Sequence, residues 1–178
     1  YLHNYNGIQN IGNTCYMNSI LQCLRNNLDL SNYFLSKQFK ENLLEKPHSF
    51  FTIAFYHLLT DLWKVEDNKK KNVVVNPIEF FNQFQKISKK CNRDVFVGFN
   101  QNDAEEFLLF VLNTIHESLQ YKDFNITIYG PIMNKSDKIQ QNFFKYLKKH
   151  LQLEGMSIVK SLFLGFQMST IINSYNDY

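Results

Sequence analysis

Residues that interrupt or cross-link a chain are scarce in this sequence, whose 178 residues include six glycines, three prolines and three cysteines. So little glycine and proline excludes a collagen-like chain or a flexible linker, and 44% hydrophobic residues exclude intrinsic disorder. Three cysteines without a Cys-x-x-Cys pair disfavour a disulfide framework and a structural zinc site. The sequence therefore indicates one domain in a reducing, intracellular compartment, the cytoplasm or the nucleus.

Long apolar runs and arginine are also lacking. The longest apolar run, Phe107 to Leu112, has six residues, whereas a membrane-spanning helix needs about 20. The N-terminal residues show no basic and apolar stretch of the kind found in a signal peptide. Of the 19 basic residues 17 are lysine, whereas nucleic-acid-binding proteins usually use arginine for bidentate contacts. A pI near 8.6 is also less basic than is typical of a nucleic-acid-binding domain. We therefore expect neither a membrane nor a nucleic-acid partner.

Most of the chain has the apolar spacing of amphipathic helices. Two segments also have the form of a capping box, Asn76-Pro77-Ile78-Glu79 and Asn102-Asp103-Ala104-Glu105. Expected helices cover residues 15–24, a segment capped by Ser49, the segments that follow the two capping boxes, and residues 139–151.

Two segments favour strands instead. Residues 124–129 alternate and end at Gly130-Pro131, and residues 157–172 mix β-branched, aromatic and glycine residues. Together the patterns predict an α+β, mainly helical fold, with helices in residues 1–155 and an incomplete set of strands in residues 156–178.

Cys15 is the first candidate for chemistry, because a polar, glycine-bearing loop leads directly into the helix that it begins. Unpaired N–H groups at a helix N-terminus favour a thiolate and can stabilise an oxyanion, and Asn10 could add an amide donor. The alternative is a structural cysteine in the core. Cys23 is expected to lie in the core beside Leu24, and Cys91 could be exposed at a helix end.

Three segments resemble one family. Residues 7–19 read GIQNIGNTCYMNS, residues 99–107 read FNQNDAEEF, and residues 157–165 read SIVKSLFLG. The first resembles the cysteine box of the ubiquitin-specific proteases, which are papain-like deubiquitinases, with Ile8 as a conservative change from leucine. The second resembles that family's Gln-x-Asp-Ala-x-Glu-Phe motif, and the third its entry into the fingers region. The chain therefore resembles the N-terminal part of such a catalytic domain, with residues 1–155 as the helical thumb and residues 156–178 as the first strands of the fingers.

The resemblance implies roles for individual residues. Cys15 would be the nucleophile that attacks the carbonyl of ubiquitin's last glycine, and Asn10 would stabilise the oxyanion. Gln101, Asp103 and Glu106 would support or contact the arginine-rich tail of ubiquitin, although helix capping and dipole compensation would also account for them. Ubiquitin or a ubiquitinated protein is the implied partner. The sequence implies no cofactor and no metal site.

The histidine base of such a nucleophile is missing from the sequence pattern. The family places it in a Gly-His-Tyr motif, and none of His3, His48, His57, His116 and His150 lies in one. Each is expected to be a surface or helix-packing histidine. Without a base for Cys15, the chain alone should not catalyse substrate turnover. Two alternatives stay open: a truncated, inactive relative that binds ubiquitin, and another class of papain-like peptidase. The sequence predicts no oligomeric state.

Overall fold

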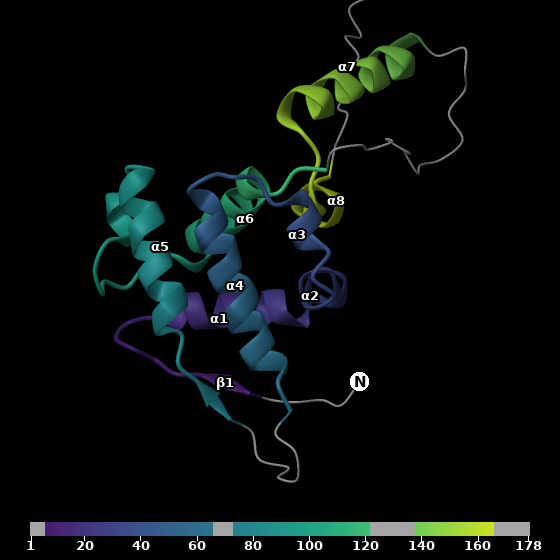
Figure 1. The fold of residues 1–178 in the computed structure, drawn as a ribbon. Helices are drawn as coiled ribbons and strands as arrows, with labels where there is room; N and C mark the ends of the chain where they lie inside the picture. The colour runs from purple at the N-terminus through teal and green to yellow at the C-terminus, as the bar shows by residue number, and fades with distance from the viewer. Residues whose placement is uncertain (1–5, 66–72, 122–137, 166–178) are drawn as a thin grey trace, which may run out of the picture.

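The computed structural model describes residues 6–65, 73–121 and 138–165, and these residues are mainly helical (Figure 1). The mainly helical architecture expected from the sequence is confirmed. The helices are α1 (Cys15–Asn26), α2 (Leu28–Leu35), α3 (Phe39–Asn42), α4 (His48–Trp63), α5 (Ile78–Lys90), α6 (Ala104–Ser118), α7 (Lys138–Glu154) and α8 (Ile158–Phe163), with a 3₁₀ turn η1 (Asp94–Phe96). The predicted strand at residues 124–129 and His3 lie outside the described residues.

A short parallel pair of strands holds the N-terminal segment. β1 (Gly7–Ile8) pairs with β2 (Val74–Val75), and Gln9 N–H donates to the Val75 carbonyl over 2.9 Å. The side chain of Asn6 extends this anchor, because its amide donates to the Asp61 and Lys64 carbonyls at the end of α4. The segment that leads to Cys15 is thereby fixed to the end of α4 and to the chain just before α5.

Phenylalanine dominates the core between α1, α2, α4, α5 and α6. Eight of the largest fully buried side chains are phenylalanines, at positions 34, 39, 51, 55, 80, 84, 96 and 107. Phe84 lies at the centre, with its ring 5.1 Å from Phe107, 5.5 Å from Phe110 and 5.4 Å from Phe96. Edge-to-face packing of such rings adds to the stabilisation from buried area. This cluster fixes α6 against α5, which matters for the site because α6 follows the acidic motif.

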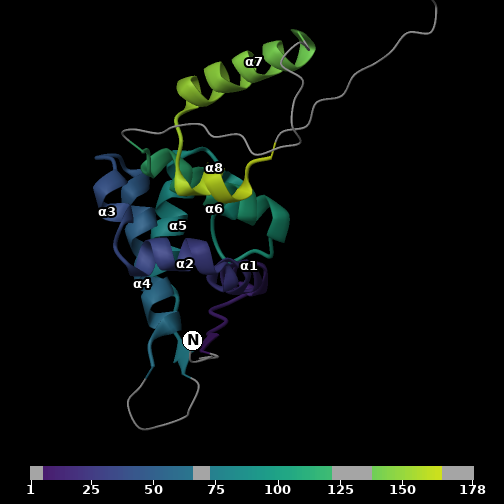
Figure 2. The ribbon, with the colours of Figure 1, turned by 90° about the vertical axis from the view of Figure 1, so that its right-hand side faces the viewer.

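The C-terminal segment differs from the sequence expectation. Residues Ile158–Phe163 form helix α8, which packs against α2 and α6, so the strand or hairpin predicted over residues 157–172 is wrong at these positions. β-Branched residues are tolerated in a single short helix where tertiary burial decides, and Val159 is buried. Figures 1 and 2 both show α7 set apart from the helical bundle. The proposed division at residue 155 remains a prediction.

Two helices have caps that differ from the expected residues, by two positions for α4 and by one for α6. α4 begins at His48, and Ser49 lies inside it and donates its hydroxyl to the Leu44 carbonyl, so Ser49 is not the cap. α6 is capped by Asp103, whose Oδ1 accepts from the Glu106 N–H over 2.9 Å, rather than by Asn102. Asn76 does accept from the Ile78 N–H at the start of α5, as the first capping box predicts.

Two further findings concern exposure. Cys23 is exposed, so the expectation that it lies in the core is wrong, because the buried face of α1 is made by Tyr16, Met17, Leu21, Leu24 and Arg25. Cys91 is exposed, as its position at a helix end allowed. Within residues 6–65, 73–121 and 138–165, no helix is long and apolar enough to span a membrane.

His116 near the end of α6 should make folding sensitive to acid. Burial, and next the positive charge of Lys160, lower the pKa of this histidine, and its Nδ1 lies 2.8 Å from the buried Ser157 hydroxyl. The unfolded chain takes up the proton near pH 6.5, whereas the folded chain takes it up only at lower pH, so stability is lost as pH falls below about 6.5. His116→Gln should flatten this part of the curve of unfolding free energy against pH. Equal curves for His116→Gln and the parent chain would contradict the assignment.

Candidate active site

Asn10 organises the loop that precedes Cys15. Its Oδ1 accepts hydrogen bonds from the Gly12 N–H (3.1 Å), the Thr14 N–H (3.2 Å) and the Thr14 hydroxyl (3.1 Å). The Thr14 hydroxyl in turn accepts from the Ile11 N–H over 3.2 Å. A single side-chain oxygen therefore closes the turn and fixes the conformation of the loop that leads into α1.

The same bonding leaves the start of α1 open for a ligand. Thr14 is the N-cap residue, but its hydroxyl is turned into the loop and makes no cap bond to the helix. No side chain caps the first turn of α1, and Cys15, its first residue, is exposed. N–H groups at a helix start without a capping side chain are donors for an anion. The thiol thus lies beside donors that can stabilise negative charge.

The loop needs glycine at position 12 because of both its backbone and its neighbour. Gly12 has φ +120°, and a Cβ built there would come within 3.3 Å of the Phe99 ring. Phe99 itself stacks on Phe81 of α5 with 5.0 Å between ring centroids, so a Cβ at position 12 would disturb this contact. Asn13 also has a positive φ, of 50°, and donates its amide to the Phe99 carbonyl over 3.0 Å. The cysteine loop is thereby attached to the segment that leads into α6.

Tyr16 makes the second attachment between these two segments. Its ring packs edge to face on Phe107 of α6, with centroids 5.5 Å apart, and its hydroxyl accepts from the Asn102 amide over 3.2 Å. Burial raises the pKa of Tyr16, so this hydroxyl stays neutral. The structure therefore brings the two motifs, 7–19 and 99–107, together.

The candidate acidic residues lie where α6 begins. Gln101, Asp103 and Glu106 are all exposed. Asp103 Oδ1 caps the helix through the Glu106 N–H, which is the structural role that the sequence left open beside substrate contact. Its second oxygen, Oδ2, stays available to a cation. Capping and substrate contact are therefore compatible at this residue.

No histidine hydrogen-bonds the Cys15 thiol within the described part of the chain. His48 contacts Cys91 and Glu117, His116 contacts Ser157, and His150 pairs with Glu154. His57 is exposed on α4. Residues 6–65, 73–121 and 138–165 also hold no group of three metal-ligating side chains placed to bind an ion. Within the described residues, the exposed Cys15 thiol lies at the start of a helix that has no N-cap side-chain bond, and no histidine bonds that thiol.

Comparison with known proteins agrees with this geometry. The model of the family described as ubiquitin carboxyl-terminal hydrolase matches residues 6–177. The chain belongs to the ubiquitin carboxyl-terminal hydrolase family. Members of this family are cysteine peptidases, and the resemblance seen in the two motifs is thereby confirmed at the level of the family.

Two family members and one solved structure show the extent of the match. Ubiquitin carboxyl-terminal hydrolase 2 of Bos taurus is 33% identical over 175 residues, which are 93% of this chain and 26% of that protein. Ubiquitin carboxyl-terminal hydrolase 12 of Saccharomyces cerevisiae is 30% identical over 176 residues, 93% of this chain and 14% of that protein. The SAGA Ubp8/Sgf11/Sus1/Sgf73 DUB module bound to ubiquitin aldehyde is similar with a TM-score of 0.47 at 29% identity, over 64% of this chain and 24% of that chain. The chain spans about a quarter or less of these relatives.

Three residues of the site escaped the sequence analysis as contributors. Phe99 and Asn102 hold the cysteine loop to the segment that leads into α6, a role that neither the motif nor the capping box predicts. Asn18 donates its amide to the Ile8 and Gln9 carbonyls, which ties α1 back to β1. The motifs already contain these residues. Polar residues beside a reactive side chain often hold its loop in place by hydrogen bonds.

Gly12→Ala should destabilise the loop. The positive φ and the 3.3 Å approach to Phe99 both oppose a Cβ, so we expect a loss of about 1–3 kcal/mol in the free energy of unfolding. Gly7→Ala is the matched control, because a Cβ at Gly7 meets nothing within 4 Å. Urea unfolding of both variants measures the difference. Equal stability of the two would show that the loop path is not constrained in this way.

Proposed function

We propose that this chain supplies the nucleophile and the oxyanion-stabilising groups of a thiol-dependent deubiquitinase, which hydrolyses the bond after the C-terminal glycine of ubiquitin. One observation carries the proposal: Asn10 Oδ1 closes the loop on Gly12 and Thr14 while the first turn of α1 at Cys15 keeps no side-chain cap. A merely structural cysteine would not need an exposed position at uncapped helix N–H groups.

The proposed chemistry assigns each group one task. The Cys15 thiolate adds to the scissile carbonyl, and the negative charge passes to the carbonyl oxygen. The Cys15 backbone N–H and the Asn10 Nδ2 donate to that oxygen. Asn10 can do this because its Oδ1 serves the loop and its Nδ2 is a separate donor on the same amide. Collapse of the intermediate then expels the amine, which takes up the proton that the Cys15 thiol gave up, and leaves a thioester for water to hydrolyse.

Negative charge at the start of α6 supports ubiquitin as the substrate. Asp103, Glu105 and Glu106 lie within the first turn or its cap, and all three are exposed. An arginine-rich tail offers guanidinium groups that pair with exposed carboxylates in a geometrically selective way. The attachment of Tyr16 to Asn102 and Phe107 keeps this acidic surface in a fixed relation to Cys15.

The second candidate function is ubiquitin binding without cleavage. It is favoured by the histidine contacts, since none of the histidines in the described ranges bonds Cys15. Both functions share the same surface and differ only in the base. Cleavage of a fluorogenic ubiquitin substrate by this 178-residue chain, in a manner abolished by Cys15→Ala, would show that a base is present in it.

Binding of ubiquitin aldehyde tests the oxyanion groups directly. The aldehyde carbon reacts with a thiol to give a tetrahedral adduct, so its affinity reports Cys15 and the donors around it. We expect Cys15→Ala to abolish the adduct in intact-protein mass spectra. Asn10→Asp should lower the affinity by about 100-fold or more, because it retains an acceptor for the loop and removes the Nδ2 donor. Unmodified ubiquitin should bind Asn10→Asp and the parent chain alike; an unchanged affinity for the aldehyde would limit Asn10 to a structural role.

Substitutions at Asp103 separate capping from charge. Asp103→Asn retains a good cap and removes the charge, so the stability should stay within a few tenths of a kcal/mol while ubiquitin affinity falls by about tenfold. Asp103→Ala should lower the ubiquitin affinity in the same way and also reduce the free energy of unfolding by about 1 kcal/mol. Glu105→Gln, in the same turn, controls for the general loss of a negative charge. Calorimetric titration with ubiquitin measures the affinities, and equal losses for Asp103→Asn and Glu105→Gln would argue against a specific contact.

A further inference from the structure

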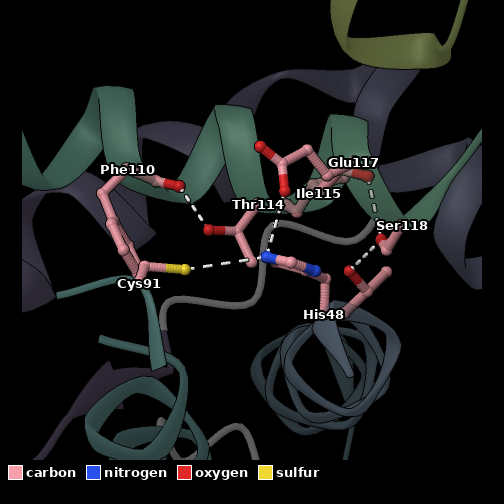
Figure 3. Close-up of polar contacts among 8 residues, drawn as sticks. His48, Cys91, Phe110, Thr114, Ile115, Glu117 and Ser118 are labelled. Atoms are coloured by element: carbon pink, nitrogen blue, oxygen red, sulfur yellow. Dashed lines mark hydrogen bonds and ion pairs between the residues drawn. The ribbon is translucent and has the colours of Figure 1, made fainter. Parts of the chain in front are cut away.

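Apart from the Cys15 site, a cysteine and a histidine lie in contact where the ends of three helices meet (Figure 3). Cys91 directly follows α5, His48 begins α4, and Glu117 lies in the last turn of α6. The Cys91 sulfur is 3.7 Å from His48 Nε2, and that same nitrogen is 3.0 Å from Glu117 Oε2. None of these residues belongs to the cysteine loop or to the acidic motif.

One nitrogen therefore faces both a thiol and a carboxylate. Neutral His48 can accept the thiol proton of Cys91 at Nε2 in the tautomer that carries its own proton on Nδ1, an atom that is buried without a hydrogen-bond partner among the described residues. After that transfer the Nε2–H is a donor, and Glu117 is placed to accept from it and to stabilise the imidazolium. The arrangement has the components of a cysteine nucleophile, a base and a carboxylate, gathered at one ring nitrogen.

The thiol needs such a base. Burial, and next the negative charge of Glu117, raise the pKa of Cys91, and the nearby Arg93 and Lys90 oppose this only in part. The resting cysteine is therefore a thiol, and a thiol is a poor nucleophile. Proton transfer to His48 is the route to a thiolate that the geometry offers.

A pocket of about 430 Å³ opens beside the cluster. Its lining offers both signs of charge, from Arg93 and from Glu106 and Glu117. Asn113 adds an amide and the half-exposed Leu109 an apolar surface. A small molecule that carries both ammonium and carboxylate groups matches this lining better than an apolar or a singly charged one.

We propose that Cys91 is a modification site that forms a mixed disulfide with a small disulfide bearing amino and carboxylate groups, of the glutathione disulfide class. The Cys91 proton passes to His48 Nε2, and the thiolate attacks one sulfur of the disulfide. A new S–S bond forms at Cys91 as the old one breaks, and the leaving thiolate takes the proton from His48. The products are the mixed disulfide at Cys91 and one small thiol. The small disulfide is the oxidant, so no other oxidant is needed.

The modification would regulate the site described above through Glu106. This residue lines the Cys91 pocket and is also exposed at the start of α6, where we place the ubiquitin tail. A bound adduct would cover its carboxylate and add charge of its own next to it. This consequence rests on the proposed function, whereas the reactivity of Cys91 does not.

The test uses the Cys15→Ala chain, in which Cys23 and Cys91 are the remaining cysteines, and Cys23 serves as the exposed comparison thiol. The chain is treated with glutathione disulfide, and the adduct at each cysteine is followed by mass spectrometry of its peptides. We expect Cys91 to react at least tenfold faster than Cys23. With the uncharged bis(hydroxyethyl) disulfide the preference should shrink. His48→Gln should slow Cys91 about tenfold and leave Cys23 unchanged.

The pH dependence provides a measurement without substitution at His48. The rate at Cys91 should fall less steeply with falling pH than the rate at Cys23, because the proton of Cys91 passes to His48 within the cluster. Equal rates and equal pH profiles for the two cysteines, or a rate at Cys91 that does not respond to His48→Gln in a folded variant, would overturn the proposal.

Ubiquitin binding by the modified chain separates the two proposals. We expect the Cys91 adduct to weaken binding of unmodified ubiquitin by about tenfold, and reduction with dithiothreitol to restore it. Equal binding with and without the adduct would overturn the regulatory role. An adduct at Cys91 in a chain that never binds ubiquitin would overturn the proposed function and leave the reactivity of Cys91 standing.

Discussion

The contact between Tyr16 of α1 and the start of α6 is the constraint on which the site depends. An edge-to-face contact with Phe107 fixes the ring, and the Asn102 amide fixes the hydroxyl. Phe107 belongs in turn to the phenylalanine cluster around Phe84, so the position of the cysteine loop is set by the core of the domain. A cysteine on a mobile loop would not hold a fixed position relative to the helix N–H groups and the acidic surface. The packing of Tyr16 fixes this position.

In the proposed function, asparagine at position 10 would serve two purposes with one side chain. The loop needs an acceptor for three donors, and the proposed reaction needs a donor for one oxyanion. A carboxylate would satisfy the loop and repel the oxyanion, whereas an amide has one end for each purpose. Because Oδ1 is held by the loop, the amide orientation is fixed before any substrate arrives, and no reorganisation is needed at the moment of reaction.

Local signals in the sequence were enough for much of the fold. Asparagine before Pro77 and the acidic run before Phe107 marked the starts of α5 and α6 to within one residue, because capping is chemistry between near neighbours. Cys23 was misplaced because it was assigned to the face of its neighbour Leu24, whereas consecutive residues of a helix point about 100° apart and the packed face of α1 excludes Cys23. Helix α8 was missed for a similar reason, since burial of Val159 against the bundle outweighs the strand preference of β-branched residues.

The pairing of His48 with Cys91 shows which features no local pattern contains. The two residues are 43 positions apart, and they meet because α4, α5 and α6 share one core, with the start of α4 beside the ends of α5 and α6. Helix α6 connects both sites of the molecule: its first turn carries the exposed carboxylates near the cysteine loop, and its last turn carries Glu117. The stripe from Glu106 through Leu109, Phe110 and Asn113 to Glu117 lines the pocket along one face of that helix, at spacings of three and four residues. Chemistry at Cys91 can therefore reach the acidic surface along a single rigid element, without a conformational change in the core.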